Sequence, residues 1–411
     1  MSAAPLSTTE LARRTYDWER IRAPFTGILE LIWQPGAAVA LLVAIRYFDA
    51  GAIPKSFISA SGFIGFLLTP VTLSLLAHSR LPATRAMAAL FIGTGLLLLG
   101  IPWIPGLTAF VALVSLAHIV MVQYVPLYTD LYRTHFTTDQ RGHRIGTVFI
   151  IVGAVGFLGN LGAGTLLDAS LDYFRPLLVL CAGCAFVSAF CLSRIPSTPL
   201  DRSQVGHPLR NLSLAWKDRL FGWMLSSWML LGFGNLMTLP LRTEYMANPR
   251  FGINADNQTI LFITGALPLL VRLVMTRLLG GLFDRCNLVT LRVGVNLLFL
   301  LSLVLFFNSS RIGMLALGMA LLGAAMAGGK ILWSLWVTKL APPEKTSAYM
   351  SVHMLCTGFR GTLSPFIGFA MLETTTPARM GNIGALLVLA ATLMFLPARR
   401  HVLRRGREKA S

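Results

Sequence analysis

The chain is a series of long apolar runs that recur from about Ala23 to Leu396, with short polar connections between them. A run of roughly 20 apolar residues crosses the hydrocarbon core of a bilayer as an α-helix, which satisfies its backbone polar groups internally. Only 13% of the 411 residues are charged, and a soluble protein carries roughly a quarter. The sequence therefore predicts an all-α, multi-pass membrane protein and argues against a large soluble helical protein.

Twelve spans are expected, six in each half of the chain. Those of the first half lie at about 23–47, 57–77, 84–103, 105–131, 145–167 and 176–195. Those of the second half lie at about 220–246, 259–279, 290–307, 312–339, 347–371 and 381–396. The predicted organisation is a cytoplasmic amphipathic segment (1–22), a six-helix bundle (23–195), a cytoplasmic linker (196–219), a second six-helix bundle (220–396) and a basic cytoplasmic tail (397–411).

The 35 Lys and Arg residues are distributed unevenly around these spans. With these boundaries, 24 lie in or beside the loops and tails of one side, 7 lie in or beside the loops of the other side, and 4 lie deeper within spans. Basic loops remain on the cytoplasmic side of a membrane, so we expect both termini to be cytoplasmic, in a bacterial inner membrane. This topology accounts for the net charge of +18, and no motif of a nucleic-acid-binding protein accompanies it.

The five cysteines indicate neither a disulfide framework nor a metal site. Cys181 and Cys184 are spaced as CxxC, but they lie within an apolar run and no second pair follows. Buried thiols of this kind usually serve packing. We therefore expect free thiols, no metal and no cofactor.

A short polar turn at 280–292 is the most specific motif of the chain, and it lies between two apolar runs. Twelve spans arranged as six plus six, a basic central linker and this turn together resemble the major facilitator superfamily of transporters. Members of that family carry a G-x-L-a-D-R-x-G-R-R signature between the second and third helix of a half. Gly280, Leu282, Asp284 and Arg285 match its first part, whereas Asn and Leu occupy the next two positions of the signature.

The resemblance implies two six-helix bundles that expose a central site to each side of the membrane in turn. In the family, the Asp and Arg of this turn latch the bundles together on the cytoplasmic side. The resemblance therefore assigns gating to Asp284 and Arg285, and a turn that only caps helix ends is the alternative. The equivalent turn of the first half, 77–85, has no Asp and matches poorly.

Four charged residues lie deep inside predicted spans, where a charge is costly and usually has a partner or a function. They are Glu30, Arg272, Lys330 and Arg360, whereas Arg277 lies nearer the cytoplasmic end of its span and Glu244, near a span end, is expected to be interfacial. By the same resemblance, the helices that carry them line or flank the central cavity. Three cations against one acid favour an anionic substrate, and we assign proton coupling to Glu30. The alternatives are ion pairing within the protein and snorkelling to the interface.

Other polar and aromatic residues lie near the middle of spans and complete the predicted substrate site. Aromatic side chains with a few convergent polar groups are typical of small-molecule sites, although each residue alone is as well explained by helix packing. Those assigned to the site are Trp33, Gln34, Gln123, Tyr124, Asn235 and Trp333.

The expected function is secondary active transport of a small organic anion, coupled to protons, by a monomer in contact with membrane lipids. Efflux of an amphipathic drug or lipid-like molecule is the main alternative. A membrane-embedded enzyme is a different class, for which His135, Asp139 and His143 would be the metal-ligand candidates. Turn chemistry explains those three residues more simply, so we do not expect an enzyme.

Overall fold

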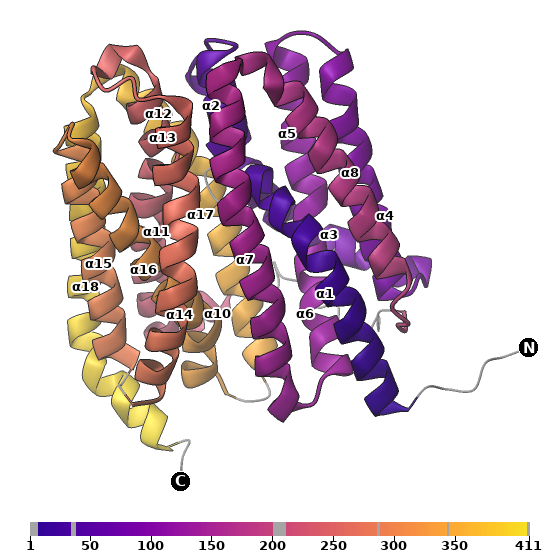
Figure 1. The fold of residues 1–411 in the computed structure, drawn as a ribbon. Coiled ribbons are helices and arrows are strands. Elements are labelled where there is room, and N and C mark those ends of the chain that lie inside the picture. Colours follow the sequence, from indigo (N-terminus) through magenta and orange to yellow (C-terminus); the bar gives the residue numbers. More distant parts are fainter. Residues whose placement is uncertain (1–6, 34–37, 200–210, 286–287, 343–344, 409–411) are drawn as a thin grey trace, which may run out of the picture.

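The computed structural model describes residues 7–33, 38–199, 211–285, 288–342 and 345–408, and it is helical nearly throughout (Figure 1). The first half contains α1 (Thr8–Trp33), α2 (Ala38–Arg46), α3 (Ala52–Ser79), α4 (Ala83–Gly100), α5 (Leu107–Val122), α6 (Tyr124–His135), α7 (Thr138–Ala169) and α8 (Phe174–Ser193). The second half contains α10 (Leu214–Lys217), α11 (Arg219–Thr238), α12 (Leu241–Ala247), α13 (Asn257–Leu261), α14 (Leu267–Arg285), α15 (Leu288–Phe307), α16 (Ile312–Leu340), α17 (Thr346–Thr374) and α18 (Pro377–Glu408).

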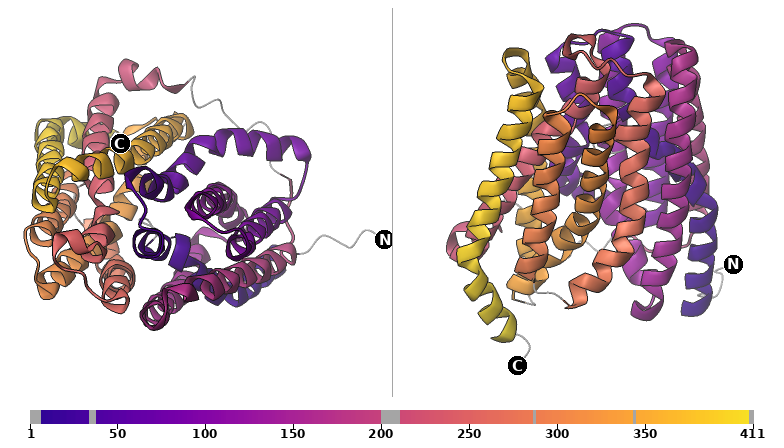
Figure 2. Two further views of the ribbon diagram at one scale, coloured as in Figure 1. Left: turned by 90° about the horizontal axis from the view of Figure 1, so that it is seen from above. Right: turned by 60° about the vertical axis from the view of Figure 1, so that its left-hand side comes forward.

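These helices form the twelve spans that the sequence predicts, because four spans each consist of two consecutive helices. The pairs are α1–α2, α5–α6, α11–α12 and α13–α14, the last joined by a π-helical turn at Phe262–Ala266. Among the described residues, ten helical segments are long and apolar enough to cross a membrane. The two halves form two groups of helices side by side (Figure 2).

Helix α1 extends further than the amphipathic segment predicted for residues 1–22. The Glu10 N–H donates to Ser7 Oγ over 3.2 Å, as the N-terminal cap of the helix. The helix then continues through Pro24, and Glu19 and Arg22 are 0% and 1% exposed. Its second half therefore belongs to the first bundle rather than to the membrane surface.

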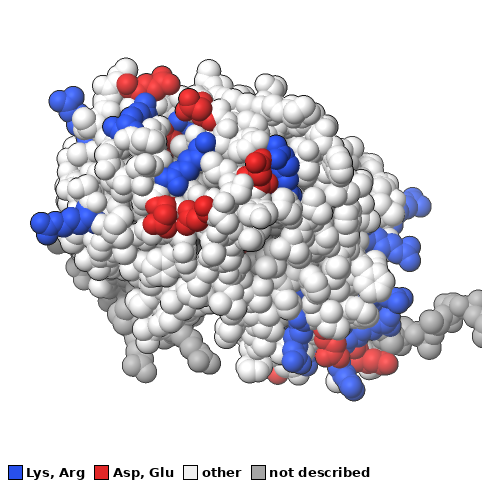
Figure 3. All heavy atoms as spheres, turned by 45° about the horizontal axis from the view of Figure 1, so that its top comes forward, with Lys and Arg blue, Asp and Glu red and all other residues white. Residues whose placement is uncertain are grey.

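The chain ends and the charges define the two ends of the molecule. Helix α1 begins and α18 ends at the same end, which we call the terminal end, and the opposite end is the distal end (Figure 1). Figure 3 shows acidic and basic groups side by side on the distal face and a broad uncharged belt beside it. Exposed large apolar side chains such as Leu75, Leu158 and Leu386 fit a belt that faces lipid.

Close helix contacts at small residues join the two halves. On one side α7 packs on α13 and α14, and on the other side α3 packs on α17. A Cβ built on Gly358 would lie 2.9 Å from Leu67 Cδ2, and Phe63 lies directly against Gly361. Small residues let helices approach this closely, so the interface between the halves is specified at these positions.

Candidate functional site

The middle of the interface between the halves brings Glu30 of α1 close to α14. A Cβ built on Gly156 of α7 would lie 3.3 Å from Glu30 Cβ and 3.5 Å from Leu269 Cδ1. Gly156 is therefore a common neighbour of the first span and the eighth. Because one helical turn is 3.6 residues, Arg272 lies about one turn beyond Leu269, and therefore about one turn from the level of Glu30.

The packing of α14 fixes the direction of Arg272. Leu269 and Leu273 lie against α7, Pro268 and Val271 lie against α16 at Gly323, and Leu270 and Val274 are exposed on the lipid side. At 100° per residue, the arc opposite the lipid side belongs to Arg272, which is half-buried. Helix geometry thus directs Arg272 toward the space between the halves, on the same inner side as Glu30.

Three further predicted site residues are partly buried polar or aromatic groups. Tyr124 lies close enough to Glu30 for their charges to interact, and it contacts the ring of Phe91 at a centroid distance of 5.3 Å. Trp333 Nε1 lies 3.5 Å from Thr357 Oγ1. Asn235 Oδ1 is buried without a hydrogen-bond partner in the described part of the chain.

Two other predicted site residues lie inside a bundle. Gln123 Nε2 donates to the carbonyl oxygens of Gly65 and Ile119, at 2.8 and 2.9 Å. These bonds tie α5 to α3, and Gln123 Oε1 is buried without a partner among the described residues, so the role of Gln123 in the site stays a prediction. Arg360 is 5% exposed and donates to the Trp228 carbonyl of α11, inside the second bundle. The structure therefore does not bring Arg360 into contact with Arg272.

The remaining predicted residues fall outside what the structure describes. Gln34 lies in an undescribed segment, and the side chains of Trp33, Lys330, Asp284 and Arg285 are likewise not described. Backbone positions place Lys330 in α16 and Asp284 and Arg285 at the end of α14. Their assigned roles stay predictions.

A polar contact set at the distal end, which the sequence reading missed, joins the two halves. We call it the distal latch: Arg46, Lys55, Asp168, Glu244 and Asn257. Lys55 Nζ of α3 lies 2.8 Å from Glu244 Oε1 of α12, and the two residues are 5% and 0% exposed. Glu244 was expected to be interfacial because it lies near a span end, but it is fully buried.

The rest of the latch uses backbone groups of the loop before α13. Arg46 donates to Asn257 Oδ1 over 2.5 Å and to the carbonyl oxygens of Ala247 and Ala255. Asp168 of α7 accepts the Asn257 and Gln258 N–H groups at 2.6 and 3.0 Å. A carboxylate at a helix N-terminus satisfies free N–H groups and favours the helix dipole, so the first half caps a helix of the second.

Asp256 adds a negative charge beside the latch. Partial burial acts to raise the pKa of its carboxyl group, but bonds from the Thr259 N–H and hydroxyl, at 2.6 and 2.8 Å, outweigh it. The pKa of Asp256 therefore lies below its usual value, and the group is ionised at neutral pH. It thus contributes to the acidic surroundings of Arg46.

A second buried polar network lies within the first bundle near the terminal end. Glu19 accepts both Arg22 Nε and Arg22 Nη2, at 3.1 and 2.8 Å, and the hydroxyl groups of Tyr128 and Tyr132, each at 2.8 Å. The network holds α1 to α6. Because both charges are paired and hydrogen-bonded, it has the character of a structural network.

The metal-site alternative has no support in the described residues. His135 Nδ1 lies 2.8 Å from Thr15 Oγ1, which is a contact between α6 and α1. Among the described side chains, no three His, Cys, Asp or Glu are grouped so that they could hold a metal ion.

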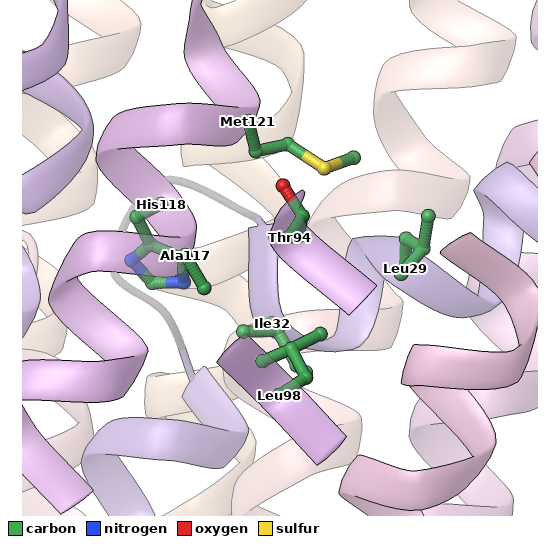
Figure 4. Close-up of a pocket in the computed structure, with 7 residues that line it drawn as sticks. All are labelled: Leu29, Ile32, Thr94, Leu98, Ala117, His118 and Met121. Carbon is green, nitrogen blue, oxygen red and sulfur yellow. The ribbon is translucent and has the colours of Figure 1, made fainter. Parts of the chain in front are cut away.

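A small void lies inside the first bundle and is lined mainly by apolar side chains (Figure 4). Its volume is about 10 Å³, which is room for at most one water molecule. It is therefore not a substrate site. The lining residues are Leu29, Ile32, Thr94, Leu98, Ala117, His118 and Met121.

Comparison with known proteins agrees with this architecture. The chain matches the Major Facilitator Superfamily over residues 35–365, and no curated protein matches it. The solved structure of the nucleoside transporter NupG superposes with a TM-score of 0.71 at 14% identity, over 93% of this chain and 99% of its own. The xylose transporter XylE from E. coli superposes with a TM-score of 0.65 at 14% identity, over 92% and 96%. A POT family transporter in complex with a conjugated peptide gives a TM-score of 0.65 at 13% identity, over 93% and 96%.

Proposed function

Because the chain belongs to the Major Facilitator Superfamily, and is thus an integral membrane transporter and not an enzyme, we propose that it moves a small organic anion by alternating access coupled to protons. The two bundles would rock about a site between them. The proposal is supported by the inward direction that the packing of α14 gives to Arg272, about one helical turn from the level of Glu30. A guanidinium group between the bundles attracts an anion in a medium of low dielectric constant, and the nearby carboxylate can carry the proton.

Arg272→Ala is expected to lower anion uptake about tenfold or more at low substrate concentration, since a hydrogen bond to a charged group contributes roughly 1.5–3 kcal/mol. Proteoliposome uptake of lactate and succinate measures the effect. Arg379→Ala, which removes an exposed arginine of α18, is the matched control. Uptake of a nucleoside or D-xylose instead of either carboxylate by the unaltered protein would contradict the choice of substrate class.

Glu30→Gln is expected to abolish accumulation driven by a pH gradient while exchange of labelled for unlabelled substrate continues. The glutamine keeps the shape of the side chain but cannot carry a proton, and exchange requires no net proton movement. The two assays are run on the same proteoliposomes, with Glu373→Gln, an exposed acid at the end of α17, as the control. Accumulation that still follows the pH gradient in Glu30→Gln would remove Glu30 from this role.

The orientation follows from the distribution of the basic residues, which favours a cytoplasmic terminal end in a bacterial inner membrane. The latch would then close the site on the outer side of the membrane. A reagent that cannot cross the membrane should reach the distal end from outside the cell only.

A further inference from the structure

Three positively charged or protonatable side chains gather inside the second bundle, around Trp228 of α11. Arg292 Cζ of α15 lies 3.5 Å from the centre of the Trp228 ring, and Arg360 of α17 donates to the Trp228 carbonyl. The ring of His353, also on α17, lies 5.4 Å from that of Trp228. Arg292, His353 and Arg360 are 1%, 0% and 5% exposed. We call these three residues the cation cluster.

The cation cluster has no carboxylate partner in the described part of the chain, although the Trp228 ring and carbonyl contact Arg292 and Arg360. All three guanidinium nitrogens of Arg292, both ring nitrogens of His353 and Nε of Arg360 are buried without a hydrogen-bond partner. The two guanidinium groups are close enough to repel each other, and His353 lies within the field of both. No described carboxylate forms an ion pair with any of the three.

An arrangement of this kind is unfavourable unless an anion completes it. Buried charges are normally paired, and an arginine does not escape the cost by losing its proton. Glu19 and Arg22 are also buried charges, but they form hydrogen bonds to each other. The unsatisfied N–H groups of Arg292 and His353 are therefore free to bind a ligand oxygen.

Aromatic rings enclose the cluster and leave one side less covered. The rings of Trp333 and Trp336 of α16 each lie 5.2 Å from His353. Trp336 is 1% exposed, whereas Trp333 is half-buried. The less covered side is thus at Trp333, a residue that the sequence reading already assigned to the substrate site.

We propose that Arg292, His353 and Arg360 form an anion site within the second bundle, which takes a carboxylate or a phosphate and is separate from the substrate site proposed between the bundles. This inference goes beyond the proposed transport function. Arg292 and His353 supply free donors, while Arg360 is already held by the Trp228 carbonyl and supplies mainly its charge. Entry past Trp333 requires a small separation of α16 from α17.

The test measures anion binding to the purified full-length protein in detergent. Succinate and inorganic phosphate are titrated against sodium chloride at equal ionic strength, and binding is followed by melting temperature and by tryptophan fluorescence, which three rings beside the cluster should report. A ligand that binds the native state raises the melting temperature. The variants are Arg292→Met and His353→Phe, each of which removes free donors.

Arg242→Met is the matched control, because Arg242 is also 1% exposed in the second bundle and has two unpartnered nitrogens, but it lies in α12 toward the distal end. We expect the half-saturating concentration to rise about tenfold or more in Arg292→Met and His353→Phe, and to stay within about twofold in Arg242→Met. Because His353→Phe keeps both guanidinium groups, it decides the question if Arg292→Met does not fold.

Three outcomes would overturn the inference in distinguishable ways. Unaltered binding in both cluster variants, with loss in Arg272→Ala, would place the anion between the bundles and leave the proposed function intact. Equal losses in Arg242→Met and the cluster variants would show a general effect of buried charge. An unaltered protein that neither binds nor transports either anion would overturn the inference and the proposed function together.

Discussion

Glu244→Gln is expected to shift the protein strongly toward a state in which the distal end is open. The glutamine keeps the size of the side chain but leaves the Lys55 ammonium group, 5% exposed, without its counter-ion. Removing one partner of a buried pair costs roughly 3–5 kcal/mol. Only the closed state bears this cost, since Lys55 reaches water when the halves separate. The ratio of closed to open protein should therefore fall by about two orders of magnitude or more.

Cysteine labelling measures this shift. Ser56 lies in α3 one residue after Lys55, its hydroxyl group lies 3.4 Å from the Pro365 carbonyl of the other half, and it is 1% exposed. A Ser56→Cys thiol should react slowly with an impermeant maleimide in the parent background and at least about tenfold faster with Glu244→Gln. The reagent should act from outside the cell, which tests the orientation in the same experiment.

Asp172→Asn is the control for that experiment. It breaks an ion pair with Arg175 that lies within one half, where the two side chains are 62% and 41% exposed. Exposed pairs contribute about 0–1 kcal/mol, so labelling at position 56 should not change. The double variant Lys55→Met with Glu244→Gln should label more slowly than Glu244→Gln alone, because no unpaired charge remains buried. Equal labelling in the parent and in Glu244→Gln would show that this ion pair does not hold the distal end closed.

The twelve-helix fold could be predicted because the length and composition of a segment determine whether it can cross a bilayer. Length and composition belong to the segment itself, so a span can be recognised without knowing which helices pack against it. The same holds for the family resemblance, which depended on a turn of a few residues at Gly280–Arg285. These inferences need only the order of residues along the chain.

The latch could not be predicted, because position along a span gives depth in the membrane but not direction around the helix. Glu244 and Lys55 both lie near span ends, where a charged side chain normally reaches water. The side chains of Glu244 and Lys55 turn inward only because of how α12 and α3 pack in the folded protein. Arg292 shows the same limit: the sequence places it at the end of the polar turn at 280–292, yet it is 1% exposed and its guanidinium group lies over the Trp228 ring.

Gln123 shows the same limit for a polar residue near the middle of a span. A polar side chain in the middle of a span attracts a functional interpretation, because an unsatisfied amide in an apolar environment is costly. In the structure the amide nitrogen is satisfied by two backbone carbonyls, one of its own helix and one of α3. Whether such carbonyls lie within reach depends on the neighbouring helix, which the sequence alone does not show.

Gly164→Ala is expected to prevent full closure of the distal end by a steric route that involves no charge. A Cβ built on Gly164 of α7 would lie 2.6 Å from the Gln258 Cα of α13. The opposing atom belongs to the backbone and cannot rotate away, so the two helices must separate by roughly 1 Å. The separation also stretches the bonds from the Asn257 and Gln258 N–H groups to Asp168. Overpacking of this kind costs about 1–3 kcal/mol. The weaker bonds to Asp168 add to this cost of the closed state.

Gly162→Ala is the matched control in the same helix, because a Cβ at Gly162 meets no atom within 4 Å. Both changes replace glycine by alanine inside α7, so both raise helix propensity by about 1 kcal/mol. Spin-label distances across the distal end should lengthen in Gly164→Ala and stay unchanged in Gly162→Ala. Transport should fall in Gly164→Ala alone. Unchanged distal distances in both variants would show that the contact at Gly164 can relax without moving the halves.

The same variant tests the gating role proposed for Asp284 and Arg285. In alternating access, a state that opens the distal end closes the terminal end, so Gly164→Ala should shorten spin-label distances across the terminal end. If Asp284 helps to latch that closed state, adding Asp284→Asn to Gly164→Ala should lengthen those distances again while the distal distances stay long. The two ends are then held by different chemistry, a buried ion pair at one and Asp284, at the end of α14, at the other. Terminal distances that do not respond to Asp284→Asn would leave the turn with only a capping role.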